Sequence, residues 1–509
     1  MSAFPQPWTS SVSHWQATNK GLSALWGHGA RDPLPTAVVD YVIIGGGMTG
    51  SSLAYQLTRP GAAGPNKSVV LLEAKDLCSG ATGRNGGHIA PYTFTAFAKF
   101  VSPLAAGGLG LTPDQALEVL ANETDTLAYA KDLISAEKLD VDFWKGFKYE
   151  GTLDRPSHAH TSVIVNQARL QAVRKTATAY LAAWEKSERH KGMKPDWEII
   201  DDEEETKKLS RIPEAVALVK SPTGTVHPHK LGTALVRLAL ETTDASFQYF
   251  SWAPVKNLTP RVEGGWIVDC HERGRITAKE VILCTNAHTK HLFPVEEQKQ
   301  GIPDHITPYR GHCANITPPP TYSGSRTIQA SGDVGDTCYY MTTPTSGLVI
   351  GIGGGDSIAL GLCTKSDVVD AVDDSVVKDS FKKYYDTWAQ NTFEGWGPQA
   401  HGEGVARTWT GIMASSRDAL PLVGPVPDKP GLYAAVAFHV TRALSKQLLT
   451  GTWDTRLPRS YAITTERLTR AKQAPRLLSK FVADAVPRGE EGIQGHLEPS
   501  GGELGAVLA

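Results

Sequence analysis

The chain has 509 residues, of which 41% are hydrophobic and 20% charged, a composition typical of a globular protein that is too long for one compact core. Lysine and arginine total 51 against 53 acidic residues, which excludes a strongly basic surface for nucleic acid or an anionic membrane. The six cysteines form no C-x-x-C pair and have no nearby histidine at zinc-ligand spacing, so we expect no metal site.

Neither end of the sequence carries a recognisable targeting signal. The start, MSAFPQPWTSSVSHWQ, lacks a basic stretch followed by an apolar core, and no apolar run approaches the length of a membrane span. The last residues, GAVLA, differ from the peroxisomal signal Ser-Lys-Leu. We therefore expect a cytoplasmic protein without a membrane partner. The extension before residue 36, with Trp8, Trp15 and Trp26, is expected to pack on its surface.

The stretch AVVDYVIIGGGMTGSSLAYQL has the pattern of a strand, a glycine turn and a helix. Residues 38–44 are a β-branched apolar run typical of a buried parallel strand, and residues 51–57 continue as a helix. Gly45, Gly47 and Gly50 fit G-x-G-x-x-G, in which glycines let the backbone turn tightly and approach a pyrophosphate at the helix N-terminus.

A second apolar strand, KSVVLLEA, ends at Glu73, whose carboxylate could accept hydrogen bonds from a ribose. Its distance from the glycine turn exceeds the usual interval of about twenty residues, and the insertion RPGAAGPNKS accounts for the excess. Strand, turn, helix, strand and acid in this order predict a dinucleotide site. The alternative is a β-α-β unit with a solvated glutamate.

The run GATGRNGGH, residues 80–88, follows the second strand and is expected on the cofactor side of the sheet, where backbone without Cβ atoms can approach a bulky ligand. Arg84 could face phosphate charge, and Asn85 offers a donor and an acceptor to a ring edge. A nicotinamide-binding domain has no evident use for this loop. The run therefore favours a flavin, whose ring system must be held beside the substrate.

With further landmarks in order, the sequence resembles the family of FAD-dependent amine and D-amino-acid oxidases, which includes glycine oxidase, sarcosine oxidase and γ-glutamylputrescine oxidase. The resemblance extends from about Asp40 to Leu468. Its landmarks are SGATGRNGGH, TGTVHPHKL, ITAKEVILCTNAHTKHLFP, ITPYRGHCANI, RTWTGIMASSRDALPLVGPV and LPRSYAITTERL. The last of these is similar to the final element of the fungal members.

The resemblance implies an α/β fold, in which a discontinuous, Rossmann-like FAD-binding domain carries an α+β substrate domain built on a mixed sheet. The implied FAD-binding domain consists of residues 37–105, 215–300 and 400–470. The implied substrate domain consists of residues 106–214 and 301–399. Residues 1–36 would form an N-terminal extension, and residues 471–509 a loosely ordered tail.

The resemblance also implies that FAD is the cofactor and that the residues at the family's binding positions contact it. These residues are Gly45, Gly47, Met48, Thr49, Gly50, Glu73, Ala74, Gly83, Arg84, Asn85, Gly86, Gly87, Val255, Asn286 and Cys338. Cys338 is included because DTCYYMTTP is similar to the segment through which sarcosine oxidases attach FAD by a thioether. An inert, half-buried thiol is the alternative.

The implied reaction is hydride transfer to the flavin N5 from the amine-bearing carbon of a small amine or amino-acid-like substrate, with oxygen as the final acceptor. His88 could bind substrate or act only structurally, and Arg310 could pair with a substrate carboxylate or bridge the domains. Neighbours in a strand point to opposite faces, so at most one of Tyr339 and Tyr340 can line the pocket, and Tyr340 is favoured. Trp409 could wall the pocket or belong to the core. The oligomeric state stays open.

The sequence departs from the family pattern after GLYAAV, where the family has a glycine turn at the pyrimidine end of the flavin. Ala437 stands where the first glycine is expected, and residues 438–443 replace the turn. Without that turn, the helix N-terminus that stabilises reduced flavin would be displaced. Two alternatives therefore stay open. One is a non-catalytic relative with impaired FAD binding, and the other is a flavin monooxygenase, which shares the first glycine turn.

Overall fold

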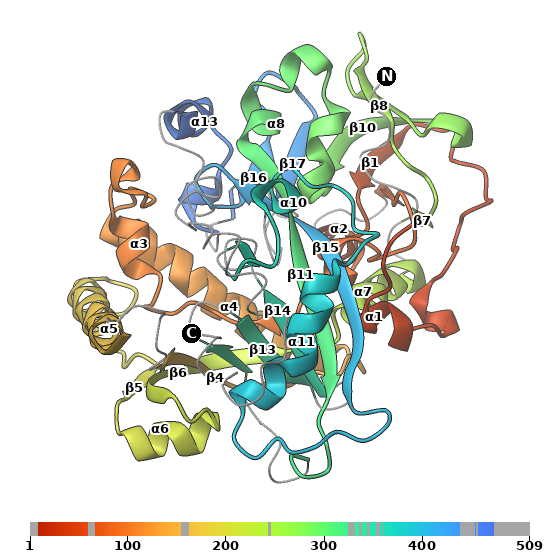
Figure 1. Ribbon diagram of the computed structural model, residues 1–509. Coiled ribbons are helices and arrows are strands. Elements are labelled where there is room, and N and C mark those ends of the chain that lie inside the picture. Colours follow the sequence, from red (N-terminus) through yellow and green to blue (C-terminus); the bar gives the residue numbers. More distant parts are fainter. Residues whose placement is uncertain are drawn as a thin grey trace.

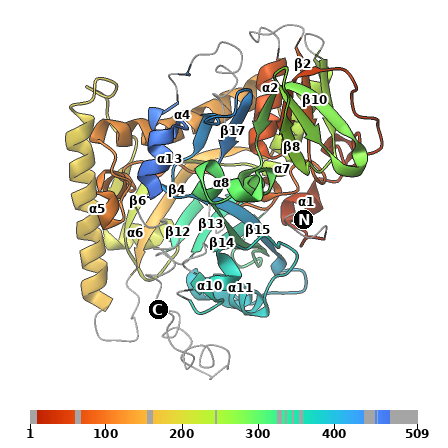
Figure 2. The same cartoon turned by 90° about the horizontal axis from the view of Figure 1, so that it is seen from above.

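Two β-sheets dominate the computed structural model. The long strands β11 (Ile306–Thr317) and β15 (Gly404–Ser416) belong to the second sheet and extend toward the first (Figure 1). Helices lie around both sheets (Figure 2). The structure describes residues 9–59, 67–153, 162–242, 246–323, 331–334, 338–343, 347–352, 357–358, 360–437, 453–454 and 457–472.

The first sheet is mainly parallel and has the strand order β16-β17-β10-β1-β2-β7, with the hairpin β8-β9 attached to β10. Its strands are β1 (Val39–Ile44), β2 (Ser68–Leu72), β7 (Ser246–Phe250), β8 (Asn257–Pro260), β9 (Trp266–Asp269), β10 (Arg275–Leu283), β16 (Leu422–Pro425) and β17 (Leu432–Val436). The apolar side chains of β1 and β2 alternate between two core clusters, one on each face of the sheet. Burial on both faces explains why these strands are continuous apolar runs.

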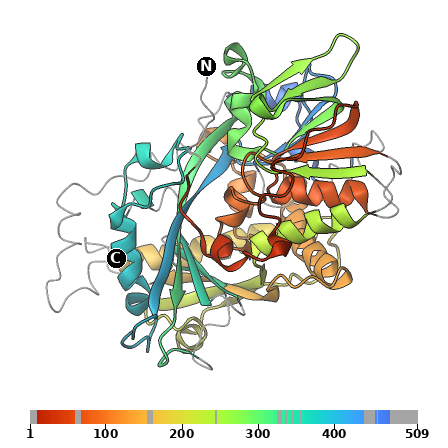
Figure 3. The same cartoon turned by 90° about the vertical axis from the view of Figure 1, so that its right-hand side faces the viewer.

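One face of the first sheet is covered by α2 (Met48–Thr58) and α7 (Pro228–Glu241), which pack against each other (Figure 3). Gly232 allows the close approach of α7, since a Cβ atom there would lie 2.3 Å from the Sγ atom of Cys78. The sequence prediction of a buried strand, a glycine turn and a helix is confirmed by β1 and α2.

The second sheet is mixed and has the order β15-β11-β14-β13-β12-β4-β6-β3, with β5 paired to β6. Besides β11 and β15, its strands are β3 (His88–Ile89), β4 (Trp144–Leu153), β5 (Glu198–Ile200), β6 (Ala215–Thr225), β12 (Ser331–Val334), β13 (Cys338–Thr343) and β14 (Gly347–Ile352). The helices around it include α3 (Phe97–Val101), α4 (Pro113–Ala136), α5 (Ser162–Trp184), α6 (Glu203–Ser210), α10 (Lys365–Val368) and α11 (Asp379–Thr392). The α/β fold class with a mixed second sheet is confirmed.

The division into domains stays a prediction. The strands of the first sheet all fall in segments assigned to the FAD-binding domain. However, β3, β6 and β15 fall in those segments too and pair within the second sheet. The chain therefore crosses between the two layers within segments that the sequence pattern treats as single units.

The N-terminal segment, residues 9–26, is more deeply embedded than expected. It contains the short helix α1 (His14–Thr18), which contacts α7, and the Trp15 ring packs with Val349 and Trp409 of the second sheet. Trp15 is 0% exposed, whereas Trp26 is 39% exposed and lies at the surface as expected. The extension is expected to pack on the surface of the protein, and the structure adds that the ring of Trp15 is buried among Cys313, Val349 and Trp409 of the second sheet. Trp8 and residues 473–509 lie outside the described residues.

Within the described part of the chain, no helix is both long enough and apolar enough to span a bilayer. The same residues contain no cluster of three or more histidine, cysteine, aspartate or glutamate side chains that could hold a metal ion.

Candidate functional site

The glycine turn after β1 has a geometry that only glycine can adopt at its two ends. Gly45 has φ +107°, in the left-handed region. A Cβ atom at Gly50 would lie 2.0 Å from the carbonyl oxygen of Gly45. Gly47 is the N-cap of α2 and provides no side-chain cap, so backbone amides are presented at the start of an 11-residue helix. Such a helix start is suited to an anion.

Two side chains accept hydrogen bonds from backbone amides of this turn. The Glu73 carboxylate, directly after β2, accepts hydrogen bonds from the amides of Gly46 (2.7 Å) and Lys75 (3.0 Å). Burial raises the pKa of Glu73, and these amides oppose the shift. The Thr82 hydroxyl accepts a hydrogen bond of 2.7 Å from the amide of Met48. Thr82 was missed in the sequence analysis, although a hydroxyl residue inside a glycine-rich run was a usable signal.

The turn, β2 and the end of β10 meet at the carboxyl edge of the first sheet. A Cβ atom at Gly45 would lie 2.6 Å from the carbonyl oxygen of Cys284, and the Oδ1 atom of Asn286 accepts a hydrogen bond of 3.0 Å from the amide of Ala437. Asn286 and Ala437 have φ values of +46° and +59°. The predicted cofactor residues Gly45, Glu73 and Asn286 are thus brought together at the edge where open α/β sheets bind ligands.

The glycine-rich loop, residues 80–88, connects this edge to the second sheet. A Cβ atom at Gly83 would lie 2.2 Å from the carbonyl oxygen of Cys78, so the loop packs closely against the chain before it. The side chain of Asn85 accepts a hydrogen bond of 2.7 Å from the amide of Gly87, which has φ +79°. Asn85 is exposed while its neighbours on both sides are buried. The tip of the loop therefore faces open space.

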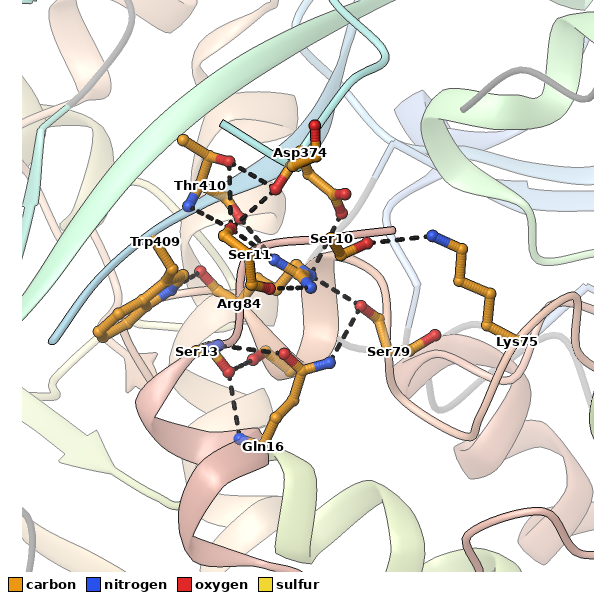
Figure 4. A network of polar contacts seen from close by, with 12 residues as sticks. Ser10, Ser11, Ser13, Gln16, Lys75, Ser79, Arg84, Asp374, Trp409 and Thr410 are labelled. Atoms are coloured by element: carbon orange, nitrogen blue, oxygen red, sulfur yellow. Dashed lines mark hydrogen bonds and ion pairs between the residues drawn. The ribbon is translucent and has the colours of Figure 1, made fainter. Parts of the chain in front are cut away.

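The guanidinium of Arg84 points toward Ser11, Asp374 and Thr410 in the interior of the protein (Figure 4). Its guanidinium is 2% exposed and forms an ion pair with Asp374, with 3.2 Å between Nε and Oδ2. It also donates to the carbonyl oxygens of Ser79 (2.8 Å) and Thr410 (2.9 Å) and to Ser11. The expected contact of Arg84 with phosphate stays a prediction without support from this geometry, because its donors are directed at protein atoms.

The predicted catalytic residues lie on three separate strands of the second sheet. His88 lies on β3, at the edge of the sheet, and pairs with Thr225 of β6. Arg310 donates to the carbonyl oxygens of Asp373 (2.8 Å) and Asp367 (3.2 Å), so it fixes the segment that leads to Asp374. The guanidinium of Arg310 is thus bonded to backbone carbonyl groups of this segment, and a role with substrate stays a prediction.

Tyr340 lies on β13, where it pairs with Ile350 of β14. Ile350 pairs in turn with Ala314 of β11, so Tyr340 does not share a register row with Arg310. For Tyr340 and Cys338 only the backbone belongs to the described residues, and residues 438–443 lie outside them. The roles predicted for these positions therefore stay predictions.

The remaining predicted cofactor residues occupy the same two regions. Met48 and Thr49 begin α2, Ala74 follows Glu73, and Gly86 is buried within the loop. Val255 is 4% exposed and belongs to the apolar cluster on one face of the first sheet. Their contacts with a cofactor stay predictions.

Comparisons with known proteins agree with this arrangement. The family described as "FAD dependent oxidoreductase" matches residues 40–445, which is more than half of the chain. No curated protein sequence matches the chain.

Three solved structures share the fold over nearly their whole length. Glycine oxidase from Geobacillus kaustophilus is 17% identical, with a TM-score of 0.58 over 84% of this chain and 99% of that one. L-amino acid deaminase from Proteus vulgaris is 13% identical, with a TM-score of 0.60 over 87% and 98%. L-proline dehydrogenase from P. horikoshii is 17% identical, with a TM-score of 0.58 over 87% and 100%. Likeness at this level of identity concerns the fold.

Proposed function

Because the chain belongs to the FAD dependent oxidoreductase family, we propose that it oxidises a C–N bond of a small amine or amino-acid-like molecule and passes the electrons to oxygen. The chain is accordingly an enzyme with FAD as its cofactor. Support for the substrate class comes from the similar folds of glycine oxidase, L-amino acid deaminase and L-proline dehydrogenase, which are named for amino acids. A cytoplasmic location is part of the same proposal, and cell fractionation tests it.

The observation that carries the proposal is the meeting of the glycine turn, Glu73 and Asn286 at the carboxyl edge of the first sheet. The residues there fit FAD. The amides at the start of α2 suit a pyrophosphate, and a Cβ atom would close the turn at Gly45 and Gly50. Acidic Glu73 lies at the end of β2, where a ribose is expected.

The glycine-rich loop provides the second half of the fit. Among the hydrogen bonds of the described residues, none is donated by the amides of Asn85 or Gly86, so both donors are available to a ligand. Bound FAD would accept the hydride from the carbon that bears the nitrogen. The protein's own contribution would be to hold the substrate between this loop and the second sheet and to exclude water from that space.

An absorption spectrum of the purified protein, recorded before and after acid precipitation, tests the cofactor first. We expect flavin bands that move to the supernatant, followed by peroxide release with one or more members of an amine and amino-acid panel. Product formation only with an artificial acceptor would contradict the part of the proposal that concerns oxygen.

The two alternatives predict other outcomes. A protein that is colourless and does not bind added FAD would be the non-catalytic relative. Flavin reduction that requires NADPH would identify the monooxygenase. Colour that stays in the acid pellet would instead indicate covalent attachment and bring Cys338 or His88 forward.

A further inference from the structure

Two buried tryptophans hold the glycine-rich loop from the side opposite its exposed tip. The indole Nε1–H of Trp409 donates a hydrogen bond of 2.8 Å to the carbonyl oxygen of Arg84. The indole Nε1–H of Trp15 donates one of 2.7 Å to the carbonyl oxygen of Asn85. Both rings are 0% exposed, and they pack in one apolar cluster with Cys313 and Val349. Neither indole can turn to water, so the two carbonyl positions are fixed.

These two hydrogen bonds determine where the loop's amides point. In a trans peptide the C=O and N–H bonds are antiparallel, and the described residues contain no cis peptide. The carbonyl of Arg84 and the amide of Asn85 belong to one peptide group, and the carbonyl of Asn85 and the amide of Gly86 belong to the next. Holding the two oxygens on the tryptophan side therefore directs the two N–H groups to the opposite side.

Neither of those two amides donates a hydrogen bond within the described part of the chain. Gly86 belongs to the buried residues, whereas Asn85 is exposed. A buried amide without an acceptor is costly unless a ligand provides one. The side to which the amides point is consequently a hydrogen-bond donor surface for the cofactor.

Further contacts from the N-terminal segment hold the same loop (Figure 4). The Ser13 hydroxyl donates to the carbonyl oxygen of Gly83, and both the Oγ and the carbonyl oxygen of Ser11 accept from the Arg84 guanidinium. Ser11 is in turn held by the carbonyl oxygen of Asp374, which accepts from its amide (2.9 Å) and its hydroxyl (2.7 Å). The N-terminal segment is therefore attached to both the loop and the second sheet.

We propose that Trp15 and Trp409 are positioning residues of the cofactor site, which aim the amides of Asn85 and Gly86 at the flavin end of FAD. This inference rests on the proposed function. It assigns a functional role to the N-terminal segment, which precedes the first strand of the FAD-binding fold. Neither tryptophan touches the cofactor in this scheme, and each acts through one peptide group of the loop.

The test uses Trp15→Phe and Trp409→Phe in the full-length chain, since phenylalanine keeps an aromatic ring and removes the N–H donor. The control is Trp396→Phe, because Trp396 is 2% exposed in a different cluster and its Nε1 atom has no hydrogen-bond partner among the residues that the structure describes. All three variants should lower the thermal midpoint of the FAD-free protein because each loses ring volume, and the two loop variants should lose more because each also loses one buried hydrogen bond. A change in the thermal midpoint alone would not distinguish positioning of the loop from packing.

Two readouts separate positioning from packing. In the FAD-free protein, hydrogen exchange at residues 84–87 is measured at the hydrogen-bonded amides of Arg84 and Gly87. It should rise at least tenfold in the two loop variants and stay within twofold of wild type in Trp396→Phe. FAD affinity, measured by titration of flavin fluorescence, should fall at least tenfold in the same two variants, with a shifted flavin absorption band.

Unchanged exchange and unchanged FAD affinity in Trp15→Phe and Trp409→Phe would overturn the inference. A wild-type protein that does not bind FAD would contradict the proposed function instead, and raised exchange at residues 84–87 would then still establish the hold on the loop. If an indole variant does not fold, Ser13→Ala removes one hydroxyl donor to the loop and little volume. Its exchange at residues 84–87 should rise several-fold, and wild-type exchange in Ser13→Ala would count against the inference.

Discussion

The ion pair between Arg84 and Asp374 tests whether this arginine joins the two layers of the fold or serves the cofactor. The two side chains are 2% and 3% exposed. In Asp374→Asn the guanidinium loses its carboxylate but keeps the carbonyl acceptors of Ser79 and Thr410. Removing one partner of a buried ion pair costs about 3–5 kcal/mol. Because the carbonyl acceptors are retained, we expect the free energy of unfolding to fall by an amount near the lower limit, about 3 kcal/mol.

Urea unfolding of the FAD-free protein, followed by tryptophan fluorescence, measures this loss as a lower midpoint. The double variant Arg84→Met with Asp374→Leu removes both charges, so it should recover most of the stability, because apolar replacement of a buried pair is often neutral. A loss below about 1 kcal/mol in Asp374→Asn would refute the reasoning. A double variant that is stable but does not bind FAD would indicate that Arg84 contributes to the cofactor site.

Gly50→Ala should abolish FAD retention because the added Cβ atom has no room. Gly80→Ala is the control and should retain FAD, because nothing lies within 4 Å of its added Cβ atom; the flavin content of the two purified variants measures the difference. Burial lowers the pKa of His227 to about 3 and that of His229 to about 4, so the unfolded chain takes up protons first below its pKa of 6.5. The contribution of these histidines to stability should therefore be complete above pH 6.5 and fall toward pH 4, by about 1.4 kcal/mol per unit of pKa difference. Thermal midpoints that stay level across this pH range would contradict the argument. Ala437→Gly should raise the free energy of unfolding by up to about 1 kcal/mol, seen as a higher urea midpoint, since φ +59° strains alanine. A lower midpoint would show that the gain in unfolded-chain entropy outweighs the strain.

The features that the sequence predicts well are those fixed by short-range pattern. An apolar run followed by glycines predicts β1 and the turn, because a buried parallel strand needs apolar side chains on both faces and φ +107° at Gly45 needs glycine. Glu73 is found at the end of β2 for the same reason, since its position follows from the length of the strand. The edge of the first sheet could be located from these residues alone.

The partner of a charged or aromatic side chain depends on tertiary contacts, and here the sequence analysis was incomplete. A contact of Arg84 with phosphate stays a prediction, and the acceptor that the structure gives it, Thr410, lies 326 positions away in the sequence and approaches only when β15 packs beside the loop. Trp15 and Asn85 are 70 positions apart. Local periodicity carries no information about such pairs, so the attachment of the N-terminal segment to the loop could not be predicted.

Ala437 shows how a departure from a motif can keep part of its geometry. The absence of glycine at this position indicates a lost turn, yet the residue has φ +59°, the conformation for which glycine is normally selected. Its amide is held by Asn286 Oδ1 at 3.0 Å, directly beyond β17, so the end of the strand and the acceptor together impose this conformation on a residue that disfavours it. The left-handed conformation costs alanine about 1–2 kcal/mol, which a well-packed fold can offset. At this position, therefore, the substitution indicates strain in the native state.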